Sequence, residues 1–310
     1  PSFCRFELYQ DAQELRGFEH AIADADAVIV GSYVEDGVVI GRWIQEIARG
    51  VTAFYDIDTP VTLATLMRGE CKYVSADIIP DYDLYLSFTG GHTLDLLETR
   101  YRSPRAAALY CSVDTQAYAP RDTRRLYDLS YIGTYSADRQ PTLERLLLEP
   151  ARRAPDLRFV VAGPQYPADI VWPRNVQRIE HVEPVDHPRF YSASRYTLNV
   201  TRRDMIAAGY SPSVRLFEAA ACDAPLISDN WEGLEAFFLP GRDIIVAHGS
   251  NDVLAKLRDG SDRERNAIAA NARARVLDAH TAKHRAAELE AILTQATTGT
   301  RLAARIVASV

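Results

Sequence analysis

The 310-residue sequence has few cysteines and no long hydrophobic run. Cys4, Cys71, Cys111 and Cys222 form no Cys-x-x-Cys pair and have no histidine at metal-ligand spacing, which argues against a zinc site or a disulfide framework. No apolar run approaches the roughly 18 residues of a transmembrane helix. Because no secretion signal precedes the first helical segment either, we expect free thiols, no transmembrane segment and a cytoplasmic location.

An excess of positive charge is also absent. The chain carries 35 Lys and Arg against 42 Asp and Glu, a net charge of -7. This balance, and the lack of a basic stripe with interleaved aromatic residues, argues against a nucleic-acid partner, although a local basic pocket for phosphates is compatible with it. The sequence contains no Walker loop and no Ser-His-Asp set, which excludes two common catalytic arrangements.

What the sequence does have is an alternation of short apolar runs with segments of helical period. This pattern predicts an α/β protein with parallel sheets, and the length suits two doubly wound domains. The predicted strands lie near 27–30, 51–56, 84–88 and 106–110, then near 129–133, 159–162, 176–181, 196–200, 225–228 and 244–246. The predicted helices lie near 13–25, 38–49, 60–67 and 92–100, then near 141–148, 187–193, 213–222, 231–238, 252–256 and 263–277.

The domain boundary is predicted where this alternation lapses. The stretch CSVDTQAYAPRDTRR, residues 111–125, is polar and without period, as a linker would be. We therefore expect a first domain over 1–120, a second over 121–295, and a C-terminal helix over 296–310 that crosses back to the first domain.

Ligands of open parallel sheets bind beyond the carboxyl ends of the strands, so residues just after strands are candidates. Gly133 and Thr134 follow the first strand of the second domain, where a glycine lets the backbone approach a phosphate. Gly163-Pro164 is a weaker candidate, since that pair is first of all a turn. Such loops are common in α/β proteins, and neither decides a function alone.

A cationic segment follows the strand near 196–200. Arg202 and its neighbour Arg203 end that strand, and Ser211 and Ser213 could cap the next helix. Arginine forks match phosphate oxygens, so an anion site is one interpretation. A solvated loop is the other.

The helix near 213–222 is almost wholly apolar yet carries Arg215 and Glu218. At about 100° per residue these two side chains fall on one flank of the helix. They could form an ion pair three residues apart, worth a few tenths of a kcal/mol. Alternatively, the helix N-terminus and Arg215 face a diphosphate while Glu218 accepts hydrogen bonds from a sugar diol.

In the first domain, polar residues follow two predicted strands. Asp56 and Asp58 end one strand, and Gly90, Gly91 and His92 come after another. Asp-x-Asp can hold a divalent cation, but the motif is weak. His92 is the best placed histidine for acid–base chemistry, although a solvated imidazole at a helix start is an equal alternative.

The segment SPSVRLFEAAACDAPLISDNWEGLEAFF, residues 211–238, resembles the donor-site signature of GT-B glycosyltransferases, particularly the branch related to spore-maturation glycosyltransferases. The segments YIGTYSADRQPTLERLLLEP, FVVAGPQYP and HVEPVDHPRFYSASRYTLNVTRRD follow in the family's order. FYDIDTPVTLATL and LYLSFTGG resemble its first domain. The resemblance implies two Rossmann-like domains facing a cleft, with a nucleotide-diphosphate sugar on the second and an acceptor on the first.

The resemblance also implies roles for particular residues. Glu218 would bind the nucleotide ribose, and the backbone around Val182 would contact the base. Arg202 and Arg215 would bind the diphosphate, with Gly133 and Thr134 close to the phosphates and Ser211, Ser213 and Val214 at the start of the donor helix. On the acceptor side lie Asp56, Gly90 and Gly91, with Asp58 and His92 as candidate catalytic bases.

Two departures from the family pattern limit this inference. Many retaining members have a second glutamate eight positions before the ribose-binding one; Tyr210 stands there, so a retaining mechanism is not supported. Asp223 replaces the usual glycine of the turn after the donor helix, which predicts an altered or strained turn. The chain also begins without Met and lacks the family's opening strand and glycine loop, which predicts a missing N-terminal segment or fused domain as a partner.

The expected function is metal-independent transfer of a sugar, with a UDP-sugar favoured, to an acceptor hydroxyl. No cofactor and no metal would be required, because arginines and helix dipoles would stabilise the leaving diphosphate. Two alternatives stay open: a nucleotide-sugar epimerase, mutase or hydrolase on the same fold, and a non-catalytic module that binds sugar nucleotides.

Overall fold

The computed structural model describes residues 4–307, which form two compact units. Among the described residues, the first unit combines the chain up to Leu109 with the chain from Ala287 onward, and the second comprises Tyr110–Ala286. The division therefore falls after Leu109 rather than at residue 120, and the part of the last helix that belongs to the first unit begins at Ala287 rather than at residue 296.

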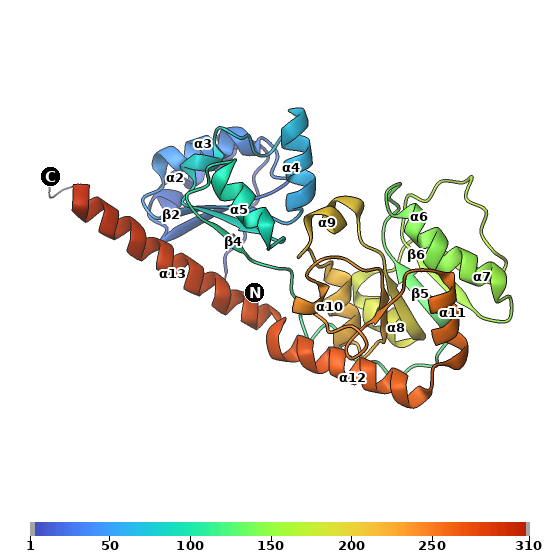
Figure 1. Cartoon of the computed structure of the whole chain (residues 1–310). Coiled ribbons are helices and arrows are strands. Elements are labelled where there is room, and N and C mark those ends of the chain that lie inside the picture. Colours follow the sequence, from blue (N-terminus) through green and yellow to red (C-terminus); the bar gives the residue numbers. More distant parts are fainter. Residues whose placement is uncertain (1–3, 308–310) are drawn as a thin grey trace. The chain divides into compact units, whose positions relative to one another are not determined.

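The first unit is built on a parallel sheet of order β1-β2-β3-β4. Its strands are β1 Ala27–Gly31, β2 Val51–Asp56, β3 Leu84–Ser87 and β4 Ala106–Ala108. Its helices are α1 Ala12–Leu15, α2 Glu19–Ala23, α3 Gly37–Ile47, α4 Thr59–Arg68, α5 His92–Thr99 and α13 Ala282–Val307, and η1 Arg16–Phe18 and η2 Ile79–Asp81 are 3-10 turns (Figure 1).

Alternate residues of these strands enter two separate cores. Phe54 and Tyr85 pack with side chains of α3, α4 and α5, whereas Ala53 and Leu86 face the other side of the sheet. On that other side, Leu289, Ile292, Leu293 and Ala296 of α13 complete the packing. The sequence prediction that the last helix returns to the first domain is confirmed, and this helix supplies apolar cover for one face of the sheet.

The second unit has a six-stranded parallel sheet of order β10-β9-β8-β5-β6-β7. Its strands are β5 Tyr127–Ile132, β6 Phe159–Ala162, β7 Val176–Ile179, β8 Ser194–Asn199, β9 Leu226–Ser228 and β10 Ile245–Val246. Its helices are α6 Gln140–Leu143, α7 Glu149–Arg153, α8 His187–Ser192, α9 Arg203–Ala208, α10 Val214–Ala221, α11 Ser250–Asp259 and α12 Asp262–Ala279. Short turns of other helical types are η3 Glu144–Leu148, η4 Pro184–Asp186 and η5 Leu234–Ala236.

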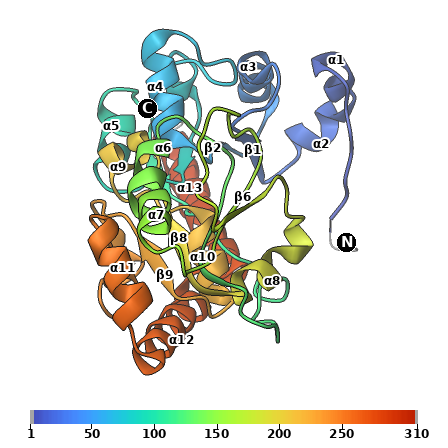
Figure 2. The same cartoon turned by 90° about the vertical axis from the view of Figure 1, so that its right-hand side faces the viewer.

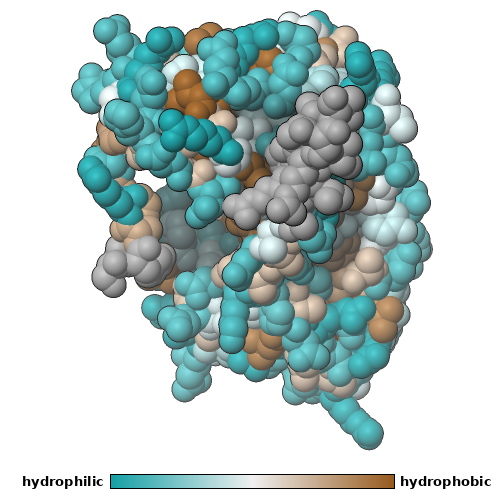
Figure 3. All heavy atoms as spheres, turned by 90° about the vertical axis from the view of Figure 1, so that its left-hand side faces the viewer, coloured by the Kyte–Doolittle hydropathy of each residue, from teal (hydrophilic) through white to brown (hydrophobic). Residues whose placement is uncertain are grey.

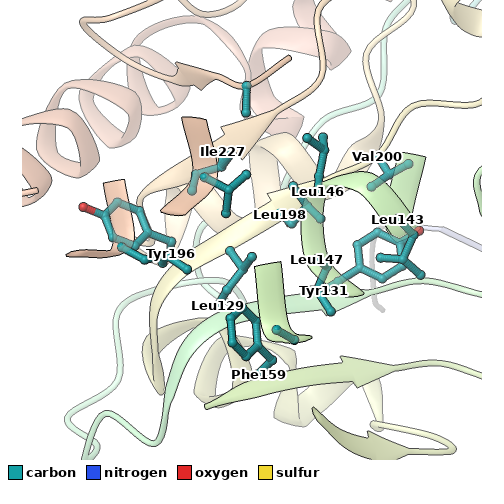
Figure 4. Packing of buried hydrophobic residues seen from close by; sticks show 14 of the residues in the cluster. Leu129, Tyr131, Leu143, Leu146, Leu147, Phe159, Tyr196, Leu198, Val200 and Ile227 are labelled. Carbon is teal, nitrogen blue, oxygen red and sulfur yellow. The ribbon is translucent and has the colours of Figure 1, made fainter. Parts of the chain in front are cut away.

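The core of the second unit lies between these strands and the helices that cover them. Leu129, Tyr131, Phe159 and Leu198 from three neighbouring strands pack with Leu146 and its neighbours (Figure 4). Helices α7 and α11 lie against each other over the same cluster (Figure 2). This buried sheet fixes where each strand ends, and so where the loops that follow can hold a ligand.

The strand order makes this sheet doubly wound. From β5 the chain moves outward through β6 and β7, then returns to the other side of β5 with β8, β9 and β10. The direction reverses between β5 and β8, and ligands of such sheets bind in the crevice beyond the carboxyl ends of the strands at this point. The α/β fold predicted from the sequence is confirmed.

Two helical predictions differ in detail, and one helix was not predicted. The predicted helix near 231–238 is one 3-10 turn, η5, because Gly233 adopts a φ of 84° that an α-helix cannot contain. The predicted helix near 141–148 ends in the π-helical turn η3, next to Pro150, whose missing N–H disfavours a regular helical ladder. The structure also contains α9, which the sequence did not predict.

The face shown in Figure 3 is mostly hydrophilic, with hydrophobic residues lying singly or in small groups. Within residues 4–307, every helix is too short or too polar to serve as a membrane span.

The turn after α10 tests the predicted effect of Asp223. This residue has a φ of 57°, and its N–H donates to the carbonyl of Ala220 at 3.0 Å. A non-glycine residue in this left-handed conformation costs free energy that glycine avoids. The Asp223→Gly variant is therefore expected to be more stable by about 0.5–1 kcal/mol. Thermal unfolding measures this change, and a Tm for Asp223→Gly at or below that of the parent chain would contradict it.

Candidate functional site

A pocket of about 330 Å³ lies at the switch point of the second unit. It is lined by Ile132, Gly133, Thr134, Gly163, Pro164, His181, Val182, Pro184, His187, Tyr191, Val214, Arg215 and Glu218. These residues come from the ends of β5 and β6, the segment after β7 and the first turns of α8 and α10. Most of the donor-binding residues predicted from the sequence therefore lie together.

Two glycines allow the pocket's loops to meet. A Cβ on Gly163 would lie 2.1 Å from the carbonyl oxygen of Gly133, and Gly163 has a φ of 132°. A Cβ on Gly133 would lie 2.7 Å from a guanidinium nitrogen of Arg215. Because no larger residue fits either position without displacing backbone or Arg215, the Gly163-Pro164 segment is more than a simple turn.

Arg215 is buried and held by acceptors on both sides of the switch point. Its Nε donates to the carbonyl oxygen of Ile132 in β5, and its Nη1 donates to Oδ1 of Asn199 at 3.1 Å. Ser213 donates to the same Asn199 oxygen at 2.8 Å. The guanidinium also lies 5.0 Å from the ring centroid of Tyr131. Arg215 is thus a fixed cation on the pocket wall.

Glu218 lies one turn further along α10 and has different partners. Its Oε2 accepts a hydrogen bond of 2.9 Å from the hydroxyl of Tyr191, which is fully buried. The pKa of Tyr191 is raised by burial and by the adjacent Glu218. Arg215 and Glu218 thus bond to different groups and, among the described residues, form no ion pair with each other, so the ion-pair alternative is wrong. Both side chains line the same pocket.

A histidine fixes the segment after β7. The Nε2 of His187 lies 3.2 Å from the carbonyl oxygen of Val182, and its Nδ1 lies 3.3 Å from the hydroxyl of Tyr118. With the proton on Nε2, His187 donates to Val182. The hydroxyl of Tyr118 lies between two acceptors, the Nδ1 of His187 and the carboxylate of Glu218. Sequence reasoning missed His187 and Tyr191, since single residues on a short helix carry no motif.

Arg139 is a second cation that sequence reasoning missed. Its Nη2 donates to the carbonyl oxygen of Thr134 at 2.6 Å, so it braces the loop after β5. Burial lowers the pKa of Arg139, and the positive charges of Arg215 and Arg202 lower it further. A carboxylate lies beside these guanidinium groups: burial opposes ionisation of Asp138, but its pKa is lowered overall by hydrogen bonds from Ser136 and from the backbone of Arg203 and by the charges of Arg202 and Arg139.

Three donor-side predictions, Arg202, Ser211 and Ser213, are not among the residues that line the pocket. Arg202 precedes α9 as its N-cap residue, and Ser211 is buried in the segment before α10. Their contact with a donor stays a prediction. Tyr210, at the position of the second glutamate of retaining relatives, has a φ of 45°, and its ring packs over Gly233.

The residues predicted in the first unit share one sheet edge, since Asp56 pairs with Ser87 in register. Asp56 is fully buried and accepts from Tyr85 at 2.7 Å; burial raises its pKa to about 6. Asp58 is the N-cap residue of α4 and accepts from Tyr33 at 2.9 Å.

On the neighbouring loop, Gly90 is buried, Gly91 has a φ of 58°, and His92 is exposed at the start of α5. The solvated histidine at a helix start, one alternative drawn from the sequence, matches this placement. Over residues 4–307, no group of three or more His, Cys, Asp or Glu side chains is arranged to hold a metal ion. Metal independence stays a prediction.

Part of the chain is similar to a known protein family. Residues 139–291, which contain α10 and most of the pocket, match the model of a family described as glycosyl transferase-like. No curated protein matches the chain.

Solved structures with the same fold include two synthases and a protein solved with UDP and glucose. Sucrose-phosphate synthase from Thermosynechococcus elongatus matches with a TM-score of 0.69 at 12% identity, covering 91% of this chain and 76% of that one. Anabaena Alr3699/HepE in complex with UDP and glucose matches with 0.69 at 11%, covering 92% and 82%. An alpha,alpha-trehalose-phosphate synthase (UDP-forming) from Burkholderia vietnamiensis matches with 0.62 at 14%, covering 93% and 81%.

The chain therefore has the GT-B fold, and its residues 139–291 are similar to the glycosyl transferase-like family. The fold predicted by the resemblance is thereby confirmed, while the spore-maturation branch and the missing N-terminal segment stay predictions. The region matched by the family model carries most of the pocket's lining residues.

Proposed function

We propose that this glycosyltransferase-like enzyme transfers a sugar from a nucleotide-diphosphate sugar, with UDP as the favoured nucleotide, to an acceptor hydroxyl. The observation that carries the proposal is the separation of charge along α10. Arg215 and Glu218 lie one turn apart, line one pocket and do not pair with each other. A cation and a carboxylate at this spacing match the diphosphate and the ribose diol of a nucleotide.

The donor's phosphates fit the end of the pocket next to Gly133. There the N-terminus of α10 at Val214 adds a partial positive charge, and Arg139 and Arg215 add full charges. The ribose then reaches Glu218, and the base lies against the backbone of Val182, which His187 holds in place. Anabaena HepE, which shares this fold, has been solved in complex with UDP and glucose and with UDP-glucose, and this favours UDP as the nucleotide of the proposed donor.

The proposed reaction needs no metal ion. As the bond between the sugar and the diphosphate breaks, negative charge grows on the diphosphate oxygen, and fixed guanidinium groups stabilise it. A base in the first unit accepts the proton of the attacking hydroxyl, for which Asp58 and His92 are the candidates.

Transfer is tested by incubating the full chain with labelled UDP-sugars, with and without a mixture of saccharide acceptors. We expect labelled product only when an acceptor is present, in the presence of EDTA as well as without it. Conversion of the donor without an acceptor would instead favour the epimerase, mutase or hydrolase alternative. Tight nucleotide binding with no conversion at all would favour the non-catalytic module.

The base is identified by comparing Asp58→Asn with His92→Gln in the same assay. Loss of one base is expected to reduce kcat by about 100-fold or more, with the donor Kd unchanged because the donor site lies in the other unit. If neither variant loses turnover, both assignments are wrong while the donor site stands.

A further inference from the structure

A second pocket, of about 530 Å³, lies within the first unit and has no part in the donor site. Its walls are the loop after β1, the outer side of α4 and the segment that follows α4. Two aromatic rings face it: Tyr33 and Tyr73, whose centroids are 4.8 Å apart and whose planes are inclined by 47°. Tyr33 is 53% exposed although it lines this pocket.

The loop that carries Tyr33 is held in a strained conformation. Tyr33 has a φ of 66° and Asp36 one of 54°, so two non-glycine residues of one short loop are left-handed. For a bulky side chain this conformation costs free energy, and such residues cluster at binding sites. The backbone of Tyr73, on another wall of the pocket, packs closely against the start of α3, because a Cβ on Gly37 would lie 2.5 Å from the carbonyl oxygen of Tyr73. The surroundings therefore impose the position of the Tyr33 ring.

The polar groups of the pocket are mainly acidic. Glu35, Asp36 and Glu70 line it with a single cation, Lys72, and the exposed Arg68 outside it pairs with Glu70 at 2.7 Å. Carboxylates accept hydrogen bonds from hydroxyl and ammonium groups, whereas they repel phosphates and other carboxylates. Aromatic faces carry negative charge and attract the C–H edge of a pyranose ring or a cation.

The two tyrosine hydroxyls connect the pocket to the carboxylates at the end of β2. Tyr33 donates to Asp58 at 2.9 Å. The hydroxyl of Tyr73 lies 2.8 Å from Oγ1 of Thr62, which in turn donates to Asp56 at 2.9 Å. A ligand stacked on Tyr33 would therefore lie next to Asp58, one of the two candidate bases.

We propose that this tyrosine pocket binds the acceptor, and that the acceptor is a saccharide that is uncharged or carries an amine. This inference rests on the proposed function, since it supplies the acceptor class for that reaction. It places the sugar ring against Tyr33 and Tyr73 and its hydroxyl or amine groups against the carboxylates. Sugar phosphates are the disfavoured class.

The binding test uses the full chain and ligand-detected saturation-transfer NMR. The probes are methyl glucoside, methyl galactoside, methyl mannoside and methyl N-acetylglucosaminide, together with glucosamine and glucose 6-phosphate. At least one neutral or amino sugar is expected to bind, and glucose 6-phosphate is expected to bind about tenfold more weakly than glucosamine. Binding of the phosphate as tightly as the amine, or binding of none of the sugars, would overturn the proposal.

A substitution of Tyr33 separates loss of binding from loss of folding. Tyr33→Gly removes the ring but also removes the left-handed strain, so the variant is expected to keep or raise the Tm while sugar affinity falls about tenfold. Tyr33→Phe keeps the ring and is expected to bind the sugar about as well as the parent chain. The control is Tyr9→Gly, an exposed tyrosine outside the pocket. Equal sugar affinity in Tyr33→Gly and the control would refute the assignment.

Failure of this proposal can be told apart from failure of the proposed function. UDP binding is measured by calorimetry on the same samples, and its site lies in the other unit. If UDP binds and the sugar result is negative, only the acceptor pocket is wrong. If sugar binds but UDP does not, the donor reaction is wrong and the pocket stands as a saccharide site.

Discussion

Glu218→Ala is expected to lower the affinity for UDP by about 100-fold, because the ribose loses a charged acceptor worth roughly 1.5–3 kcal/mol for each hydrogen bond. The same change leaves the buried Tyr191 hydroxyl without the acceptor it contacts at 2.9 Å. Calorimetric titration with UDP measures the loss. Glu218→Gln keeps the shape of the side chain and one acceptor oxygen. Its affinity for UDP should therefore fall between that of the parent chain and that of Glu218→Ala.

The control for this experiment is Glu235→Ala. Glu235 is exposed on η5 and lies outside the pocket wall, so its loss removes the same charge without touching a ligand. If Glu218→Ala binds UDP as tightly as this control, the donor site is misplaced. A melting curve for each variant shows whether an affinity change reflects unfolding instead.

Gly163→Ala is expected to destabilise the second unit by on the order of 3 kcal/mol and to abolish nucleotide binding. The added methyl group would stand 2.1 Å from the carbonyl oxygen of Gly133, a backbone atom that cannot rotate away. To relieve this overlap the loop after β5 must move, and with it the phosphate end of the pocket. Chemical denaturation measures the stability, and calorimetry with UDP measures the binding.

Gly241→Ala is the matched control for the conformational part of that effect. Gly241 has a φ of 77° but nothing within 4 Å of the position of its Cβ. Its substitution should cost only the left-handed strain, about 1–2 kcal/mol, and leave UDP affinity unchanged. A Gly163→Ala variant no less stable than Gly241→Ala would show that the loops after β5 and β6 can adapt to the added methyl group. The hypothesis of a rigid phosphate-binding loop would then be wrong.

The sequence predicted the strands and most of the residues that line the pocket at the switch point, because both depend on local patterns. A buried parallel strand is a short apolar run, and Gly133, Gly163 and the charges of α10 follow such runs at recognisable positions. The doubly wound order then brings these loop ends together without further information. Arg215 and Glu218 are an example: their common flank was visible from helical periodicity alone.

What the sequence could not predict are the partners supplied by distant segments. Asn199 joins Arg215 to Ser213, and Arg139 braces Thr134, yet neither belongs to a motif. The tyrosine pocket is a stronger case, because Tyr33 and Tyr73 stand forty positions apart and meet only through the packing of α3 and α4. Such pairings depend on tertiary packing, which periodicity does not encode.

The return of α13 to the first unit has a consequence for the order in which the chain folds during synthesis. Strands β1 to β4 leave the ribosome first, but one face of their sheet packs against residues 289–296. The 177 residues between the two parts of the first unit, 110–286, must be made before that cover arrives. Domains usually fold as they emerge, from the N-terminus onward. Here the whole second unit is translated before the first unit is complete. Until α13 is translated, the sheet of β1 to β4 therefore exposes an apolar face to which a chaperone or another unfolded chain can bind.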